Sequence, residues 1–186
     1  MKAAPEGGGG CFRDGRSLSW IDGVGVVTRG IYKGAALQLV DDKLRVAIPA
    51  SLRNTIIANS PEADMRVTIA VHAQGDCLIG YDLPWGLELN ARANARDLAH
   101  ADEKGEIDYD YKRRVANGED LPFDPSGRFI MNGFHKKKAG IGKYAFFYGQ
   151  WDHFEIWDPA TLLAVQADGT MRDNLEYLLE EKGIVL

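Results

Sequence analysis

Asp41-Asp42-Lys43-Leu44-Arg45 and Asp124-Pro125-Ser126-Gly127-Arg128 are two versions of one pattern, in which an arginine follows an aspartate by four residues. Each stretch has the composition of a turn and leads into an apolar run. Further along, Leu78-Ile79-Gly80-Tyr81-Asp82 resembles Phe154-Glu155-Ile156-Trp157-Asp158, an apolar strand that ends in an aromatic residue and an aspartate. The chain therefore consists largely of two similar halves. Such a duplication suits a repeated or pseudo-symmetric partner better than a single catalytic pocket.

The composition is that of a folded globular protein. Of the 186 residues, 45% are hydrophobic and 26% are charged, which suffices for one ordinary core or two small ones. No apolar run reaches the roughly 20 residues that cross a bilayer, and residues 1–10 lack the apolar core of a secretory signal. We therefore expect a cytoplasmic protein without a membrane partner.

Charge is distributed unevenly along the chain. The net charge of −5 argues mildly against a nucleic-acid partner, because phosphate binding depends on basic surface. Residues 125–151, however, contain five basic and no acidic residues, whereas residues 152–186 contain eight acidic and two basic ones. We therefore expect the protein to have a basic side close to the second Asp-x-x-x-Arg stretch.

The apolar periodicity and the turn signals predict the order strand, turn, strand, short helix, strand, strand, helix in each half. The two strands around residues 41–45 are expected to form a tight hairpin. The predicted division of the chain is a flexible extension at 1–29, a first module at 30–83, a helical connector at 84–118, a second module at 119–158 and a C-terminal helical segment at 159–186.

The arginine at the end of each turn is the main candidate for chemistry. A guanidinium on a protruding turn can fork onto guanine in the major groove or clamp a phosphate. An equally simple interpretation is that Asp41 and Asp124 pair with Arg45 and Arg128 and only fix the turns. Both interpretations hold if each aspartate orients its arginine.

Signatures of catalysis are weak in this sequence. Residues 139–144 resemble the end of a phosphate-binding loop but lack its first glycine and its final serine or threonine. The four histidines have no metal-ligand spacing, and no serine or cysteine lies in a nucleophile elbow. We expect no enzyme activity, no cofactor and no metal.

Taken together, the motifs from Tyr32 to Leu163 resemble the MraZ family of bacterial transcriptional regulators, whose halves are similar to AbrB-type swapped-hairpin DNA-binding domains. The first half carries the resemblance in residues 32–35, 40–49 and 52–53. The second half carries it in residues 123–128, 139–141 and 149–158.

The resemblance implies an α+β, mainly β fold with two tandem swapped-hairpin, AbrB-like β-barrel modules related by a pseudo-two-fold axis. It also implies a ring-shaped homo-oligomer, an octamer or dodecamer, on the nucleoid. The ring would bind short direct repeats of double-stranded DNA in the promoter of the division and cell-wall gene cluster, normally as a repressor. The implied DNA-binding residues are Arg45, Lys43, Lys33 and Arg128, with Asp41, Asp124 and Gly127 as structural residues of the motif.

Leu44 stands where the second turn has Gly127. Because leucine rarely adopts a positive φ, we expect the first turn to differ in geometry from the second. Two alternatives to the regulator hypothesis are a ring-forming scaffold that uses Lys136–Lys138 and the acidic C-terminal segment, and an AbrB-like antitoxin whose residues 168–186 neutralise a toxin.

Overall fold

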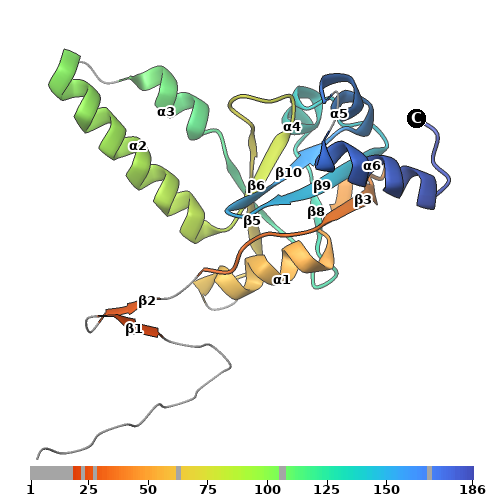
Figure 1. Ribbon diagram of the computed structural model, residues 1–186, viewed down its shortest axis with the longest axis horizontal. Helices are drawn as coiled ribbons and strands as arrows, with labels where there is room; N and C mark the ends of the chain where they lie inside the picture. Colours follow the sequence, from red (N-terminus) through yellow and green to blue (C-terminus); the bar gives the residue numbers. More distant parts are fainter. Residues whose placement is uncertain (1–18, 22–23, 27–28, 62–63, 105–107, 167–168) are drawn as a thin grey trace, which may run out of the picture.

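The computed structural model describes residues 19–21, 24–26, 29–61, 64–104, 108–166 and 169–186. Most of the predicted extension at 1–29 and part of the segment 168–186 named for the antitoxin hypothesis, Asp168, lie outside these ranges. Two described strands of the extension, β1 (Ser19–Ile21) and β2 (Val24–Val26), pair with each other as a hairpin (Figure 1).

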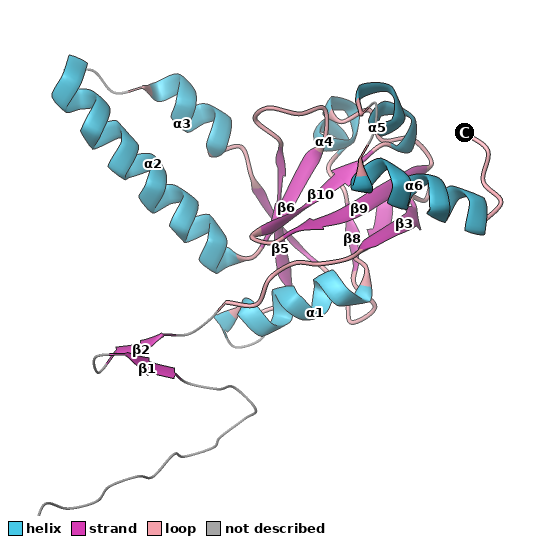
Figure 2. Cartoon of the chain, in the orientation of Figure 1, coloured by secondary structure: helices cyan, strands magenta, loops and turns pink. Residues whose placement is uncertain are grey.

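The centre of the molecule is an antiparallel sheet of six strands in the order β3-β9-β10-β6-β5-β7 (Figure 2). Two further strands, β4 (Arg45–Ala47) and β8 (Arg128–Ile130), pair with each other as a separate antiparallel ribbon. The combination of antiparallel strands and helices is an α+β architecture. The strands of the sheet are β3 (Ala35–Leu39), β5 (Arg66–Val71), β6 (Leu78–Tyr81), β7 (Glu119–Pro122), β9 (Tyr144–Gln150) and β10 (His153–Trp157).

Several helices begin at capping residues. Asp158 accepts hydrogen bonds from the backbone N–H and the hydroxyl of Thr161 and so caps α5, as expected for an aspartate before a first-turn proline. The long helix α2 extends away from the sheet and α3 returns beside it (Figure 1), held by an ion pair between Asp97 and Lys112. The described helices are α1 (Ala50–Asn59), α2 (Leu83–Lys104), α3 (Tyr109–Val115), α4 (Gly133–Lys138), α5 (Pro159–Val165) and α6 (Thr170–Glu181).

Strand pairing crosses between the two halves of the chain. The first strand of each half pairs with the third strand of the other half, β3 with β9 and β7 with β5. The second strands, β4 and β8, pair with each other, as do the fourth strands, β6 and β10. The two halves therefore contribute to the same sheet.

The predicted hairpin around residues 41–45 is wrong in its pairing. The turn itself forms, because the N–H of Leu44 donates to the carbonyl of Asp41 over 2.9 Å. The strands on either side then diverge, β3 into the six-stranded sheet and β4 into the ribbon. Each strand satisfies its backbone hydrogen bonds with a strand of the other half, which local periodicity does not reveal.

Both halves contribute to one hydrophobic core, and neighbouring residues of β9 show how the sheet divides the apolar side chains. Phe147 packs into the core shared by the halves, with Val46, Ile56 and Phe129 among its members. Phe146 points to the opposite side, where α5 and α6 supply Leu162, Leu175 and Leu179. The C-terminal helix α6 therefore buries its apolar side against the sheet of its own chain.

A buried carboxylate ties the residues that precede β3 to the sheet. Asp82 is completely buried and accepts hydrogen bonds from Arg29, Tyr32, Asn59 and the backbone N–H of Trp85. Burial by itself raises the pKa of Asp82, but the bonds from Arg29, Tyr32 and the other donors outweigh it, so the pKa lies below its usual value. Arg29, the last residue of the predicted extension, thereby pairs with the body of the protein.

Prediction: Gly149→Ala destabilises the protein by about 2 kcal/mol, because a side chain there has no room. A Cβ on Gly149 would stand 2.7 Å from both the backbone nitrogen and the Cα of Lys33. The adjacent backbone is held by the hydrogen bond from Gly149 N–H to the carbonyl of Gly34. Urea denaturation measures the difference in unfolding free energy. Gly133→Ala, where a Cβ meets nothing within 4 Å, should change stability by less than about 0.5 kcal/mol; equal effects of the two variants would contradict the explanation.

Candidate nucleic-acid interface

The ribbon of β4 and β8 brings the two turn arginines onto one outward face. Arg45 lies opposite Ile130, and Ala47 lies opposite Arg128. Residues opposite each other in an antiparallel pair, and residues two apart in one strand, point to the same side. The alternate positions, Val46 and Phe129, are each only 1% exposed. One face of the ribbon therefore packs into the shared core, and the other presents both arginines.

The two turns have the same hydrogen bonds. In the first, Asp41 Oδ1 accepts from the backbone N–H of Lys43 and of Arg45, and Oδ2 accepts from Arg45 Nε at 2.6 Å. In the second, Asp124 accepts in the same way from Ser126 and Arg128, with 2.8 Å to Arg128 Nε. Each aspartate therefore fixes its own turn and orients its own arginine, which makes the two interpretations of the sequence compatible.

The expected difference between the turns is absent. Leu44 adopts a φ of 60° and Gly127 a φ of 82°, so both residues are left-handed. Leu44 tolerates this conformation because the turn is over-determined. Its N–H donates to Asp41, its carbonyl accepts from the N–H of Met131, and its side chain packs against the core.

The arginines keep part of their hydrogen-bonding capacity. The Nε atom of each arginine donates to its aspartate. The described part of the chain provides no hydrogen-bond acceptor for the terminal Nη atoms. The side chains of Arg45 and Arg128 are 48% and 59% exposed. Together with Asp124 and Ile130 they line a surface hollow of about 410 Å³. The geometry leaves two oriented guanidinium groups open to a ligand with oxygen or nitrogen acceptors.

Lys43 and Lys33 lie at different ends of the first strand. Lys43 is exposed within the first turn, one residue from Leu44. Lys33 precedes β3, whose five residues span roughly 16 Å, and it lies next to Gly149 at the far end of that strand. The structure therefore brings Lys43, but not Lys33, together with the turn arginines.

Arg53 is a further basic residue at the second turn. A Cβ on Gly127 would lie 3.0 Å from Cδ and 3.2 Å from Nη1 of Arg53, so this side chain of α1 runs alongside the turn of the other half. It is partly exposed. The second turn is thus flanked by Arg128 from its own half and Arg53 from the first half.

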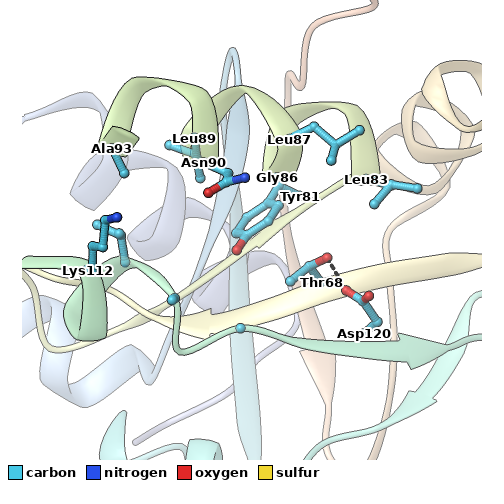
Figure 3. A pocket seen from close by; sticks show the side chains of 13 residues that line it. Thr68, Tyr81, Leu83, Gly86, Leu87, Leu89, Asn90, Ala93, Lys112 and Asp120 are labelled. Carbon is cyan, nitrogen blue, oxygen red and sulfur yellow. Dashed lines mark hydrogen bonds between the residues drawn. The ribbon is translucent and has the colours of Figure 1, made fainter. Parts of the chain in front are cut away.

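A cavity of about 310 Å³ lies elsewhere, between α2 and α3 and strands β5 to β7 (Figure 3). Its lining is mostly apolar and includes Tyr81, Lys112 and one carboxylate, Asp120, to which the hydroxyl of Thr68 donates. Burial, and secondarily Asp120, raises the pKa of Tyr81.

The described ranges contain no group of three or more histidine, cysteine, aspartate or glutamate residues placed to hold a metal ion. Among the helices that the structure describes, none combines the length and apolar character needed to cross a membrane.

Comparison with individual known proteins identifies the family, although no family model matches the chain. It is 32% identical over 147 residues to the transcriptional regulator MraZ of Oleidesulfovibrio alaskensis, which covers 77% of this chain and 93% of that protein. The chain belongs to the MraZ family. Proteins of the same name from Nitratidesulfovibrio vulgaris and Pseudomonas fluorescens are 28% and 29% identical over 155 and 161 residues, covering 83% and 80% of this chain and 97% and 99% of their own lengths.

Membership of the MraZ family confirms the resemblance that the sequence motifs indicated. In the sequence analysis Arg53 contributed only to the family motif, and neither Arg53 nor Ile130 was named as a candidate site residue. Arg53 and Lys136 each follow the turn arginine of their own half by eight residues, which is a signal for a repeated basic position. Ile130 lies between Phe129 and Met131, both buried, so strand alternation alone indicates that it points outward.

Prediction: Arg45→Ala leaves the pKa of Asp41 below its usual value of about 3.9. The backbone N–H of Arg45 is the main cause of the lowered pKa of Asp41, and its side chain is a smaller one; the variant removes only the side chain. A carboxylate with a lowered pKa stabilises the turn above its unfolded-state pKa, and this contribution is lost as pH falls through the folded-state value. Carboxyl ¹³C NMR titration measures the pKa of Asp41 in the wild-type protein and in the variant. A return of Asp41 to the ordinary value in the variant would show that the side chain, not the backbone, sets the pKa.

Proposed function

We propose that this MraZ-family chain is a sequence-specific DNA-binding transcriptional regulator and that the outward face of the β4–β8 ribbon contacts the DNA. The observation that carries the proposal is the presence of two oriented arginines, Arg45 and Arg128, on one exposed face. The major groove, about 12 Å wide, admits a two-stranded ribbon. Arginine forks onto the O6 and N7 acceptors of guanine there.

The aspartates prepare the arginines for this role. Asp41 and Asp124 hold Nε and leave the terminal nitrogens for acceptors on DNA. A guanidinium that is already oriented loses less conformational entropy on binding. Because the carboxylates also accept backbone N–H groups, they are partly neutralised by their own turns and repel phosphates less than free carboxylates do.

Arg53 and Lys43 supply contacts to phosphate, which position a protein on DNA without reading its sequence. Arg53 lies alongside the second turn and Lys43 is exposed in the first. This local basic charge answers the objection that the net charge is −5, because association depends on the local surface. The role of Lys33 remains a prediction from the resemblance.

The remaining features of the proposal rest on the family resemblance. Residues 30–83 and 119–158 act as two swapped-hairpin, AbrB-like modules, and the exchange of strands between the halves supports this description. The chain assembles into a ring on the nucleoid and represses the division and cell-wall gene cluster by binding direct repeats in its promoter. Several copies of a modest basic surface then act together on repeated boxes and gain avidity.

Prediction: Arg45→Ala and Arg128→Ala each weaken binding to the protein's own upstream DNA by about 1–3 kcal/mol per site and reduce the preference over a scrambled duplex. Arg53→Ala weakens binding to both duplexes and lowers the slope of log affinity against log salt by about one. Fluorescence anisotropy over a salt titration measures the affinity of the three variants for both duplexes. Arg113→Ala, an exposed arginine that pairs with Asp110 on α3, is the matched control and should bind normally. Normal specific binding by both turn variants, with folding checked by circular dichroism, would refute the site.

Prediction: native mass spectrometry of the full chain detects a closed oligomer, an octamer or a dodecamer, and Arg45→Ala has the same mass distribution, because the turn arginines face outward on each protomer. A monomer at micromolar concentration would refute the ring. A ring without specific DNA binding would instead favour the scaffold hypothesis.

A further inference from the structure

Ile130, the last residue of β8, is a large apolar side chain on the outward face of the ribbon. It is 62% exposed, while its neighbours in the chain, Phe129 and Met131, are 1% and 0% exposed. The register places it directly opposite Arg45. Because side chains alternate along β8, Ile130 points away from the core, and its apolar surface is in contact with water.

Ile130 shares its surface hollow with two arginines, with the carboxylate of Asp124 and with the apolar residues Pro122, Phe123 and Phe129. Arg45 lies across from it and Arg128 two residues before it in the same strand, and all three line one surface hollow. Because Phe123 and Phe129 are buried, Ile130 is the large apolar side chain that this hollow exposes beside the two oriented arginines. The partner of this face therefore needs acceptors for the arginines and an apolar group beside them.

The floor of the major groove offers this combination. Guanine presents acceptors there, and thymine presents its C5-methyl group, which apolar side chains contact. Opposite residues of an antiparallel pair have Cβ atoms about 5 Å apart, and successive nucleotides of one strand rise about 3.4 Å. Ile130 therefore reaches a base pair one or two steps from the one that Arg45 contacts.

We propose that Ile130 contacts the methyl group of a thymine adjacent to the guanine read by Arg45, and so adds a base preference that the arginines do not supply. This inference rests on the proposed function, of which it specifies one base contact. The equivalent position in the first half is Ala47, opposite Arg128, whose single methyl group reaches less far. The thymine preference is consequently expected on one side of the binding box.

The test replaces single thymines of a minimal upstream duplex by deoxyuridine, which removes the methyl group and retains base pairing. One replacement is expected to weaken binding of the wild-type protein about fourfold, because it removes one methyl group that is buried in the complex. Ile130→Ala is expected to lose about the same affinity on the thymine duplex and to be insensitive to that replacement. Leu98→Ala, an equally exposed apolar residue on α2 that is 70% exposed, is the control and should keep the wild-type sensitivity.

The outcomes separate the inference from the function on which it rests. If the wild-type protein binds its upstream DNA specifically but no thymine can be replaced with loss of affinity, the inference is wrong and the proposed function stands. If Ile130→Ala keeps the full sensitivity, another residue contacts the methyl group and the inference is again wrong. Absence of specific binding by the wild-type protein would overturn the proposed function itself. Because deoxyuridine leaves the protein unchanged, misfolding cannot imitate a positive result.

Discussion

The hydrogen bonds that join each turn to the strand end of the other half hold the architecture together. The carbonyl of Gly127 accepts from the N–H of Ile48, and the carbonyl of Leu44 accepts from the N–H of Met131, so each turn is bonded to the strand end of the other half. These bonds flank the β4–β8 ribbon, whose inward residues Val46 and Phe129 belong to the shared core. A left-handed residue directs each carbonyl to its partner. This requirement explains why Leu44 accepts a conformation that glycine adopts more readily.

The same constraint creates the candidate interface. Each Asp-x-x-x-Arg turn orients one arginine locally, but two arginines share a face only because the ribbon pairs the halves in one register. A slip of one residue would turn one arginine toward the core. The stability of the protein and the proposed DNA contact therefore depend on the same strand pair. The position of Arg53, which comes from the first half and lies at the second turn, depends on this pair as well.

The second repeated motif shows how the halves have diverged. Asp82 and Asp158 both follow an aromatic residue at the end of a strand and both accept N–H groups at the start of a helix. Asp158 also accepts from Gly142 near the protein surface. Asp82 is instead buried and binds Arg29 and Tyr32, so it became the anchor of the N-terminal side of the body. The local role of the motif is shared, whereas the long-range partners are particular to each half.

The sequence by itself determined the order of strands and helices, the two turns and the family, because turn chemistry, capping and periodicity are properties of neighbouring residues. It also indicated Arg45 and Arg128 as candidate DNA-binding residues. The tertiary structure decided that β3 pairs with β9 rather than with β4 and that Lys33 lies apart from the turns. It also decided that Arg53 lies beside the second turn and that Ile130 is on the exposed face of the ribbon. Several strands could pair with one another equally well, and which of them pair depends on how both halves fill one core. That is a property of the whole chain, and no local stretch of sequence encodes it.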